Sequence, residues 1–230
     1  MRARYLLACC TLLAACDKPA PTSPPPSGDS STQHHGINVT KVLQENAAPP
    51  KAERHGAPLT VLGLHLGMDI HEVPSVMMDI LAERQLSNLG FTDAIRTGGD
   101  TQCVLMYTKP WLTAIESRME DRYGKALAAG KTNGELLTAC INADGVMAVK
   151  ADAGKEVSSI EFSNVREIFD AQDLTPAAFA KKLAGDLHLP TFTPDASQTS
   201  WTYTNPDGDK LEVSSKDVLG IPRLWLRLSR

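Results

Sequence analysis

The chain has 230 residues, of which 23 are lysine or arginine and 27 are aspartate or glutamate, giving a formal net charge of −4 at pH 7. Proteins that bind nucleic acid usually carry a basic patch or stripe, so this balance argues against nucleic acid as a partner. No apolar run approaches the length that spans a bilayer as a helix.

The first 15 residues have the features of a secretory signal. Arg2 and Arg4 supply a basic start, and residues 5–15 form a short apolar run that leads through small residues into Cys16. This arrangement resembles the signal peptide and lipobox of bacterial lipoproteins. The resemblance implies cleavage before Cys16 and acylation of that cysteine, and hence an envelope protein facing the periplasm. An ordinary secretory signal ending near a cysteine is the alternative.

The predicted anchor makes the lipid bilayer the first expected partner. Two or more acyl chains on Cys16 would hold the protein stably on a membrane. Asp17 follows directly and resembles the inner-membrane retention signal of enterobacterial lipoproteins, which favours the inner over the outer membrane.

Residues 16–58 are expected to form the lipidated cysteine and a disordered linker. Eight prolines lie between Ser, Thr, Asp, Gly and Ala in this stretch, a composition that buries too little apolar surface to offset the entropy of ordering. The globular region is therefore predicted to be 59–230, long enough for one sizeable core or two small ones.

Cysteine usage predicts one disulfide. Of five cysteines, Cys9 and Cys10 leave with the signal peptide and Cys16 is lipidated, so Cys103 and Cys140 remain. In an oxidising periplasm such a pair is most simply a bridge, worth roughly 3–4 kcal/mol on the chain-entropy description. Two separately buried thiols are the alternative.

The first half of the globular region is expected to start with a strand within 59–68. Residues 69–72 form a capping-box pattern with Asp69 in the capping position, and apolar spacing through residue 81 predicts a helix that residues 88–90 end. A second helix is predicted over 111–127, broken by Gly130, Asn133 and Gly134. A hairpin over 140–150 and a strand over 157–162 follow.

The second half repeats this order. Thr175 and Pro176 predict a helix start, and Pro190 follows its end. Strands are predicted at 201–204, 210–213 and 223–228. The sequence thus predicts an α+β fold of helices on an antiparallel sheet, with two possible diverged repeats at 59–165 and 166–230.

One motif resembles a known family. Gly63, Leu66, Gly67, Met68 and the pair Glu72-Val73 match the start of BamE/SmpA-like and BLIP-like domains, with Asp69 departing from the usual Ser or Thr. The resemblance implies a helix pair on an antiparallel sheet and a role in binding other proteins. It supplies no site residues.

No catalytic constellation is recognisable, and neither a metal nor a cofactor is expected. His71-Glu72 has no second spaced ligand, and the carboxylates of residues 116, 120 and 121 most resemble a solvated helix face. The candidate partner-binding residues are Arg223, Trp225 and Arg227, which share one face of a period-2 strand. A packed tryptophan covered by arginines is the alternative.

These features predict a lipid-anchored periplasmic protein-binding module without catalysis. An inhibitor or immunity-type lipoprotein is its most concrete form. The alternative is an accessory lipoprotein of outer-membrane protein assembly, which the BamE-like motif favours. A cell-wall-active enzyme is the third hypothesis.

Overall fold

The computed structural model describes residues 56–96, 101–218 and 221–230. The chain divides into two units, Met1–Lys51 and Ala52–Arg230, and all described residues belong to the second. The predicted signal peptide, the predicted lipid-attachment residue Cys16 and most of the predicted linker therefore lie outside the described residues.

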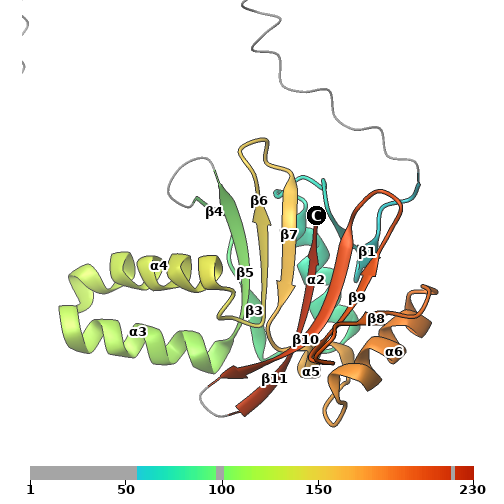
Figure 1. Cartoon of the computed structure of the whole chain (residues 1–230). Helices are drawn as coiled ribbons and strands as arrows, with labels where there is room; N and C mark the ends of the chain where they lie inside the picture. Colours follow the sequence, from blue (N-terminus) through green and yellow to red (C-terminus); the bar gives the residue numbers. More distant parts are fainter. Residues whose placement is uncertain (1–55, 97–100, 219–220) are drawn as a thin grey trace, which may run out of the picture. The chain divides into compact units, whose positions relative to one another are not determined.

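The second unit is built on one large antiparallel sheet, so the predicted α+β class is confirmed (Figure 1). Its strand order is β3-β5-β6-β7-β11-β10-β9-β8, with β4 paired to β5, and a separate small sheet pairs β1 with β2. The strands are β1 (Thr60–Val61), β2 (Leu64–His65), β3 (Leu89–Phe91), β4 (Ile95–Arg96), β5 (Gln102–Thr108), β6 (Met147–Ala151), β7 (Val157–Phe162), β8 (Thr193–Pro194), β9 (Ser200–Thr204), β10 (Lys210–Val218) and β11 (Ile221–Ser229). The helices are α2 (Val73–Glu83), α3 (Lys109–Tyr123), α4 (Lys125–Asn142), α5 (Val165–Phe169) and α6 (Pro176–Asp186).

The strand predicted within 59–68 is a two-stranded hairpin instead. Leu62 and Gly63 both have positive φ, at 54° and 81°, which closes a tight turn between β1 and β2. Gly67 also has a positive φ of 80°, and its N–H donates to the Val157 carbonyl at 2.7 Å. The family-like motif thus turns the chain and attaches it to the start of β7.

The predicted capping residue Asp69 caps a turn and not α2. Its Oδ1 accepts the N–H of His71 at 2.9 Å, and α2 begins later, at Val73, after an N-cap without a side-chain bond. Pro74 lies in the first turn, where its missing N–H removes no helical hydrogen bond. The helix ends at Glu83, before the predicted stop, because residues 89–91 pair as β3 with β5.

The main core lies on one face of the sheet, under α2, α5 and α6. Phe162 of β7, Phe169 of α5 and Phe179 of α6 pack edge to face, with ring centroids 5.3 and 5.5 Å apart. The same cluster takes in the apolar side chains of α2 and of the β1–β2 hairpin. This face is therefore fully occupied by the chain's own elements.

A helical hairpin of α3 and α4 covers part of the opposite face and extends away from the sheet at the β5 side (Figure 1). Here the sequence prediction was wrong, because α4 runs through Gly130, Asn133 and Gly134 and ends only at Asn142. The predicted hairpin over 140–150 is also wrong in its first arm, which is the last turn of α4. Small residues such as Ala128 and Ala139 are buried in α4 and let it pack closely against its neighbours.

The second half agrees with the sequence. Thr175 caps α6, its Oγ1 accepting the Ala178 N–H at 3.2 Å. The predicted strands correspond to β9, β10 and β11, although β10 continues to Val218. The first half, however, begins with the β1–β2 hairpin and carries α3 and α4 between β5 and β6, for which the described part of the second half has no counterpart. The strands of the two halves meet where β7 pairs with β11.

Candidate binding surface

The candidate residues Arg223, Trp225 and Arg227 lie on one face of β11, as their spacing predicted. Leu224, Leu226 and Leu228 alternate with them and are buried in the main core, at 3% exposure or less. The alternation follows from the pleat of the strand, which sends successive side chains to opposite faces. The three candidates therefore face away from the core, on the side of the sheet that carries the α3–α4 hairpin.

The strand register extends this face over the neighbouring strands. Lys216, Ser214 and Glu212 of β10 are the cross-strand partners of the three candidates. On the other side, Glu161 of β7 is the partner of Arg227. Directly paired residues point to the same face, so these side chains form one continuous surface.

Only part of this side of the sheet is covered. The α3–α4 hairpin contacts β5 and β6, whereas α6 meets β9 and β10 from the core side. The outward side chains of β7, β11, β10 and β9 thus make up a surface that we call the open face. Rigid, paired strands hold every residue of the open face in place.

Trp225 lies at the boundary between the covered and open parts. It is only 7% exposed and packs with Leu105, Ala143 and Ala148 beneath the hairpin. The Lys216 ammonium lies 3.5 Å from its ring centroid, within cation–π range. The tryptophan is therefore packed, as the sequence alternative held, but its cover is a lysine and not the two arginines, which stay exposed.

The indole nitrogen of Trp225 is buried and has no hydrogen-bond partner. Buried Trp N–H groups usually find an acceptor, and an unsatisfied one costs roughly 1–3 kcal/mol. This position is therefore held by the packing of the ring and not by polar bonding.

The open face carries a surplus of positive charge. Glu161 is largely buried and pairs with Lys150 at 3.1 Å and with Arg227 at 4.0 Å. Lys210 and Glu212 form a second pair at 3.0 Å. Among the described residues of this face, the charged side chains are the cations Lys210, Lys216, Arg223 and Arg227 and the carboxylates Glu161 and Glu212, while Lys150 of the neighbouring strand β6 pairs with Glu161. The sign is opposite to the net charge of −4 for the whole chain.

A small cavity of about 230 Å³ marks the edge where the hairpin meets the open face. Its lining includes Trp111 of α3, Asp144 after α4, and Arg223. Tyr107 lies nearby, its ring centroid 6.2 Å from that of Trp111. Burial, together with the charge of Glu116, raises the Tyr107 pKa, so its phenol stays neutral at physiological pH. The cavity offers one cation, one carboxylate and an aromatic ring to a side chain of a partner.

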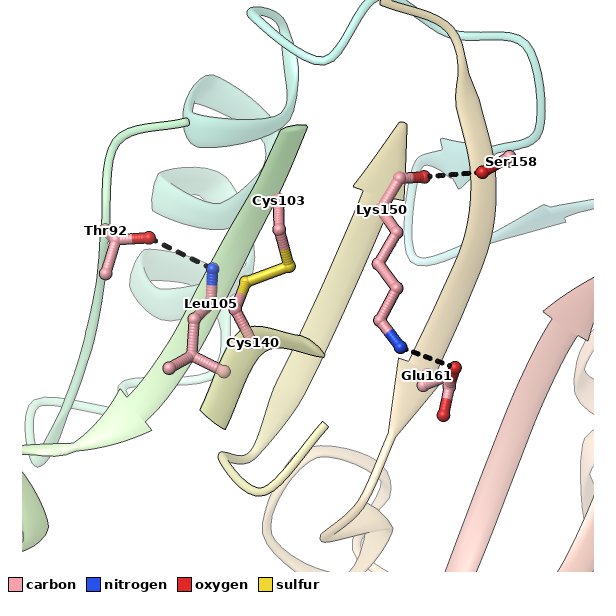
Figure 2. Close-up of a disulfide and its surroundings, with 7 residues drawn as sticks. All are labelled: Thr92, Cys103, Leu105, Cys140, Lys150, Ser158 and Glu161. Atoms are coloured by element: carbon pink, nitrogen blue, oxygen red, sulfur yellow. Dashed lines mark hydrogen bonds and ion pairs between the residues drawn. A yellow bond between two sulfur atoms is a disulfide. The ribbon is translucent and has the colours of Figure 1, made fainter. Parts of the chain in front are cut away.

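The hairpin that borders the open face is held by the predicted disulfide, which the structure confirms. Cys103 of β5 and Cys140 of α4 are bonded, with their Cα atoms 6.2 Å apart and both side chains fully buried (Figure 2). The same view places the Lys150–Glu161 pair on the adjacent strands β6 and β7. The bridge ties the base of α4 to the sheet beside the open face.

The other polar residues that the sequence raised do not assemble into a site. His71 and the α3 carboxylates at 116, 120 and 121 are exposed, and His65 Nδ1 lies 3.1 Å from the Leu66 carbonyl oxygen. Within the described ranges, no group of three His, Cys, Asp or Glu side chains is placed to hold a metal ion.

Sequence reasoning missed Lys216 and the cavity residue Asp144. The alternation of Lys210, Glu212, Ser214 and Lys216 with Leu211 and Val213 could have revealed the polar face of β10. The sequence predicts Asp144 in a hairpin turn, and nothing in the sequence indicates that Asp144 and Arg223 line the same cavity.

The comparisons with known proteins leave the interpretation to the residues themselves. No family model, curated protein or solved structure matches this chain. No helix within the described part of the chain is long and apolar enough to cross a membrane.

Proposed function

We propose that this chain is a lipid-anchored periplasmic protein that binds a protein partner through the open face and performs no catalysis. Its most concrete form is an inhibitor or immunity-type lipoprotein. The observation that supports the proposal most strongly is the open face itself, a rigid cationic strand surface around Trp225 and Lys216 that the chain's own helices leave uncovered.

The construction of the open face suits tight binding. Arginine and tryptophan are enriched among the residues that dominate interface energies. The strands are already paired and Trp225 is already packed, so little ordering entropy remains to be lost on association. A partner would contact the exposed guanidinium groups of Arg223 and Arg227 around the Lys216–Trp225 contact.

The charge of the open face indicates the partner's chemistry. Four cations and two carboxylates would meet an acidic protein surface with complementary potential. The surplus is local, because the whole chain is acidic. Association should therefore be fast and should weaken as the salt concentration rises.

The anchor belongs to the proposal as well. Cys16 follows a lipobox-like sequence, and Asp17 favours the inner membrane. About 40 linker residues of flexible composition would have an r.m.s. span of roughly 35 Å, so the globular part could reach partners away from the membrane.

The alternative, an accessory role in outer-membrane protein assembly, rests on the BamE-like motif. Its glycines have structural roles in this chain, since Gly63 closes a turn and Gly67 bonds to Val157. The motif therefore favours a BamE/BLIP-like fold more than it favours either function, and two diverged repeats stay part of the proposal. Membrane fractionation separates the two roles, because the assembly role requires outer-membrane residence.

The test is a crosslinked pull-down of the full lipidated chain from native envelopes, compared with Arg223→Glu. A single stoichiometric protein should be captured, and the substitution should reduce its recovery about tenfold or more. Lys181→Glu on α6 is the matched control, because it makes the same charge change at an exposed lysine away from the open face. Equal recovery with both variants would contradict the proposal, and capture of assembly components would favour the alternative role.

A further inference from the structure

The outward side of α4 carries an apolar surface that no described element covers. Leu127 and Ile141 are 61% and 51% exposed, among the most exposed large apolar residues of the described chain. Together with Gly130, Gly134 and Leu137 they recur at intervals of three and four residues, which aligns them on one side of a helix. We call these five residues the α4 outer face.

The rest of α4 is arranged so that the outer face contains no charge. The packed side of the helix is formed by Ala128, Thr132, Ala139 and Cys140, which are buried against α3 and the sheet. With 3.6 residues per turn, the charged residues Lys125, Lys131 and Glu135 lie about 80° or more from the centre of the outer face. An exposed helix face normally carries charged or polar residues, so an apolar one indicates a binding surface.

The two glycines point to a helical binding partner. A Cβ built on Gly130 or Gly134 would meet nothing within 4 Å, so the monomer does not require glycine at either position. Each glycine costs the helix about 1 kcal/mol relative to alanine. Glycine on a helix surface allows another backbone to approach closely, which offsets this cost only when a second helix is present. An insertion into lipid would instead favour large apolar or aromatic side chains.

We propose that the α4 outer face pairs with the same face of a second copy of this chain, with the two helices antiparallel. Four of its five residues are symmetric about the level of Thr132, because Leu127 and Leu137 lie five residues on either side and Gly130 and Gly134 lie two. The fifth, Ile141, lies beyond this symmetric stretch. A two-fold axis that crosses the outer face at the level of Thr132 along the helix therefore sets Leu127 against Leu137 of the other copy and glycine against glycine. Such self-complementarity is what a two-fold interface requires.

The charges at the edge of the face are compatible with this pairing. Lys131 and Glu135 lie on the same edge, so the two-fold axis brings Lys131 of one copy beside Glu135 of the other. Glu135 contacts Arg118 at 3.7 Å but remains 45% exposed and accessible. Opposite charges thus meet along the edge that flanks the apolar contact.

The size of the face predicts a weak dimer. A helix of 18 residues is about 27 Å long, and two of the five residues of the outer face are glycines, so a single helix–helix contact here buries a small area. Stable complexes typically bury about 1,200 Å² or more. Pairing should therefore depend on concentration and be favoured where chains are held together on a membrane.

The test uses disulfide trapping between two purified full-length variants, Leu127→Cys and Leu137→Cys, each also carrying Cys9→Ala, Cys10→Ala and Cys16→Ala, so that the introduced cysteine is the one free thiol beside the Cys103–Cys140 bridge. At millimolar concentration under mild oxidation, the mixture should give a 127–137 crosslinked dimer at least about tenfold faster than either variant alone. In the antiparallel pair, residue 127 of one copy lies roughly 15 Å along the helix from residue 127 of the other copy. A disulfide cannot span this distance, so neither variant should crosslink efficiently with itself.

Two further measurements make the result decisive. Gly134→Lys in both variants should abolish the mixed dimer, whereas Gly185→Lys on α6, where a Cβ also meets nothing within 4 Å, should leave it unchanged. Crosslinking of each variant with itself at the same rate as the mixture would overturn the proposal, because it would indicate random collision. No crosslink above that of Ala177→Cys mixed with Lys181→Cys on α6 would also overturn it.

Discussion

Two side chains, Trp225 and Lys216, form the centre of the open face. The ammonium of Lys216 lies 3.5 Å from the indole centroid and shields a ring that is already 93% buried. The contact joins β10 to β11 through side chains in addition to the backbone ladder. It thereby fixes the lysine where a partner would meet it.

A double-mutant cycle measures this contact. Lys216→Gln and Trp225→Leu, alone and together, should give a coupling free energy of unfolding of about 0.5–1 kcal/mol, the value typical of a partly exposed cation–π pair, because neither substitution leaves a cation or an aromatic ring in place. Urea unfolding followed by far-UV circular dichroism provides the four values. Additive single substitutions would show that the lysine and the ring do not interact in solution.

Asp195, in the turn between β8 and β9, should titrate unusually low. The Ser197 hydroxyl at 2.8 Å is the largest cause, and the backbone N–H groups of Ser200 and Thr199 also donate to the carboxylate, so that the pKa falls from 3.8 to about 2. Desolvation is the second-largest influence and raises the pKa, but the hydrogen bonds together outweigh it. NMR titration should find Asp195 near pH 2 and find it moved toward 3.8 in Ser197→Ala.

The low pKa has a defined consequence for stability. A carboxyl group with a pKa lower in the folded than in the unfolded chain stabilises the fold above the unfolded value and loses that contribution as pH falls through the folded value. Asp195→Asn should therefore be less stable than the parent above pH 4, and the two should converge near pH 2. A constant difference from pH 2 to 7 would contradict the assignment.

At the scale of elements, α4 is the helix that differs most from the prediction made from the sequence. Gly130, Asn133 and Gly134 predict a break, yet the helix continues through them because tertiary contacts outweigh local propensity. The buried residues Ala128, Thr132 and Ala139 have small side chains, which allow α4 to pack closely against its neighbours. The spacing of residues within one helix does not reveal such packing. An Asp-Gly pair follows the final turn of α4. Because such a pair is typical of a β-hairpin turn, the sequence predicts a strand where the structure has helix.

Elements with local signals were predictable. The cap at Thr175 defines the start of α6, and the alternation of residues 223–228 defines both the strand and the burial of Leu224, Leu226 and Leu228. Residues 223, 225 and 227 were placed on a common face for the same reason. The coverage of that face by the α3–α4 hairpin depends on long-range packing and was not predictable from spacing.

The glycines of α4 give a prediction about helix stability. Gly130→Ala and Gly134→Ala should each raise the unfolding free energy of the dilute protein by about 0.5–1 kcal/mol, or a Tm by roughly 1–4 °C, because the added Cβ meets nothing. Gly185→Ala in α6 should behave similarly and serves as the reference. A loss of stability at 130 or 134 alone would show that the monomer needs glycine there.

At the scale of the whole molecule, the two faces of the large sheet have different surroundings. Its first face is sealed by α2, α5 and α6, while its second face is divided between the α3–α4 hairpin and the open face. The disulfide lies at this division and joins β5 to the end of α4. It therefore secures the border of the proposed binding surface as well as the fold.

Loss of the disulfide should destabilise the protein measurably. The bridge closes a separation of 37 residues, for which the chain-entropy description gives roughly 3–4 kcal/mol. Reduction, or the double substitution Cys103→Ala with Cys140→Ala, should lower the Tm by about 6–16 °C. Unchanged melting in reductant would be inconsistent with a stabilising bridge. The double variant, which has no bridge to reduce, is the control for other effects of the reductant.

The most direct test of the central claim places a photoreactive amino acid at Ser214, the cross-strand neighbour of Trp225 on the open face. The full-length chain, with the proposed anchor residue Cys16 retained, is irradiated in living cells and compared with the same label at Ala177, an exposed position on α6. We predict one discrete protein adduct from position 214, absent from position 177 and lost with Arg223→Glu. No protein adduct at 214, or the same adducts at both positions, would contradict a partner bound by the open face.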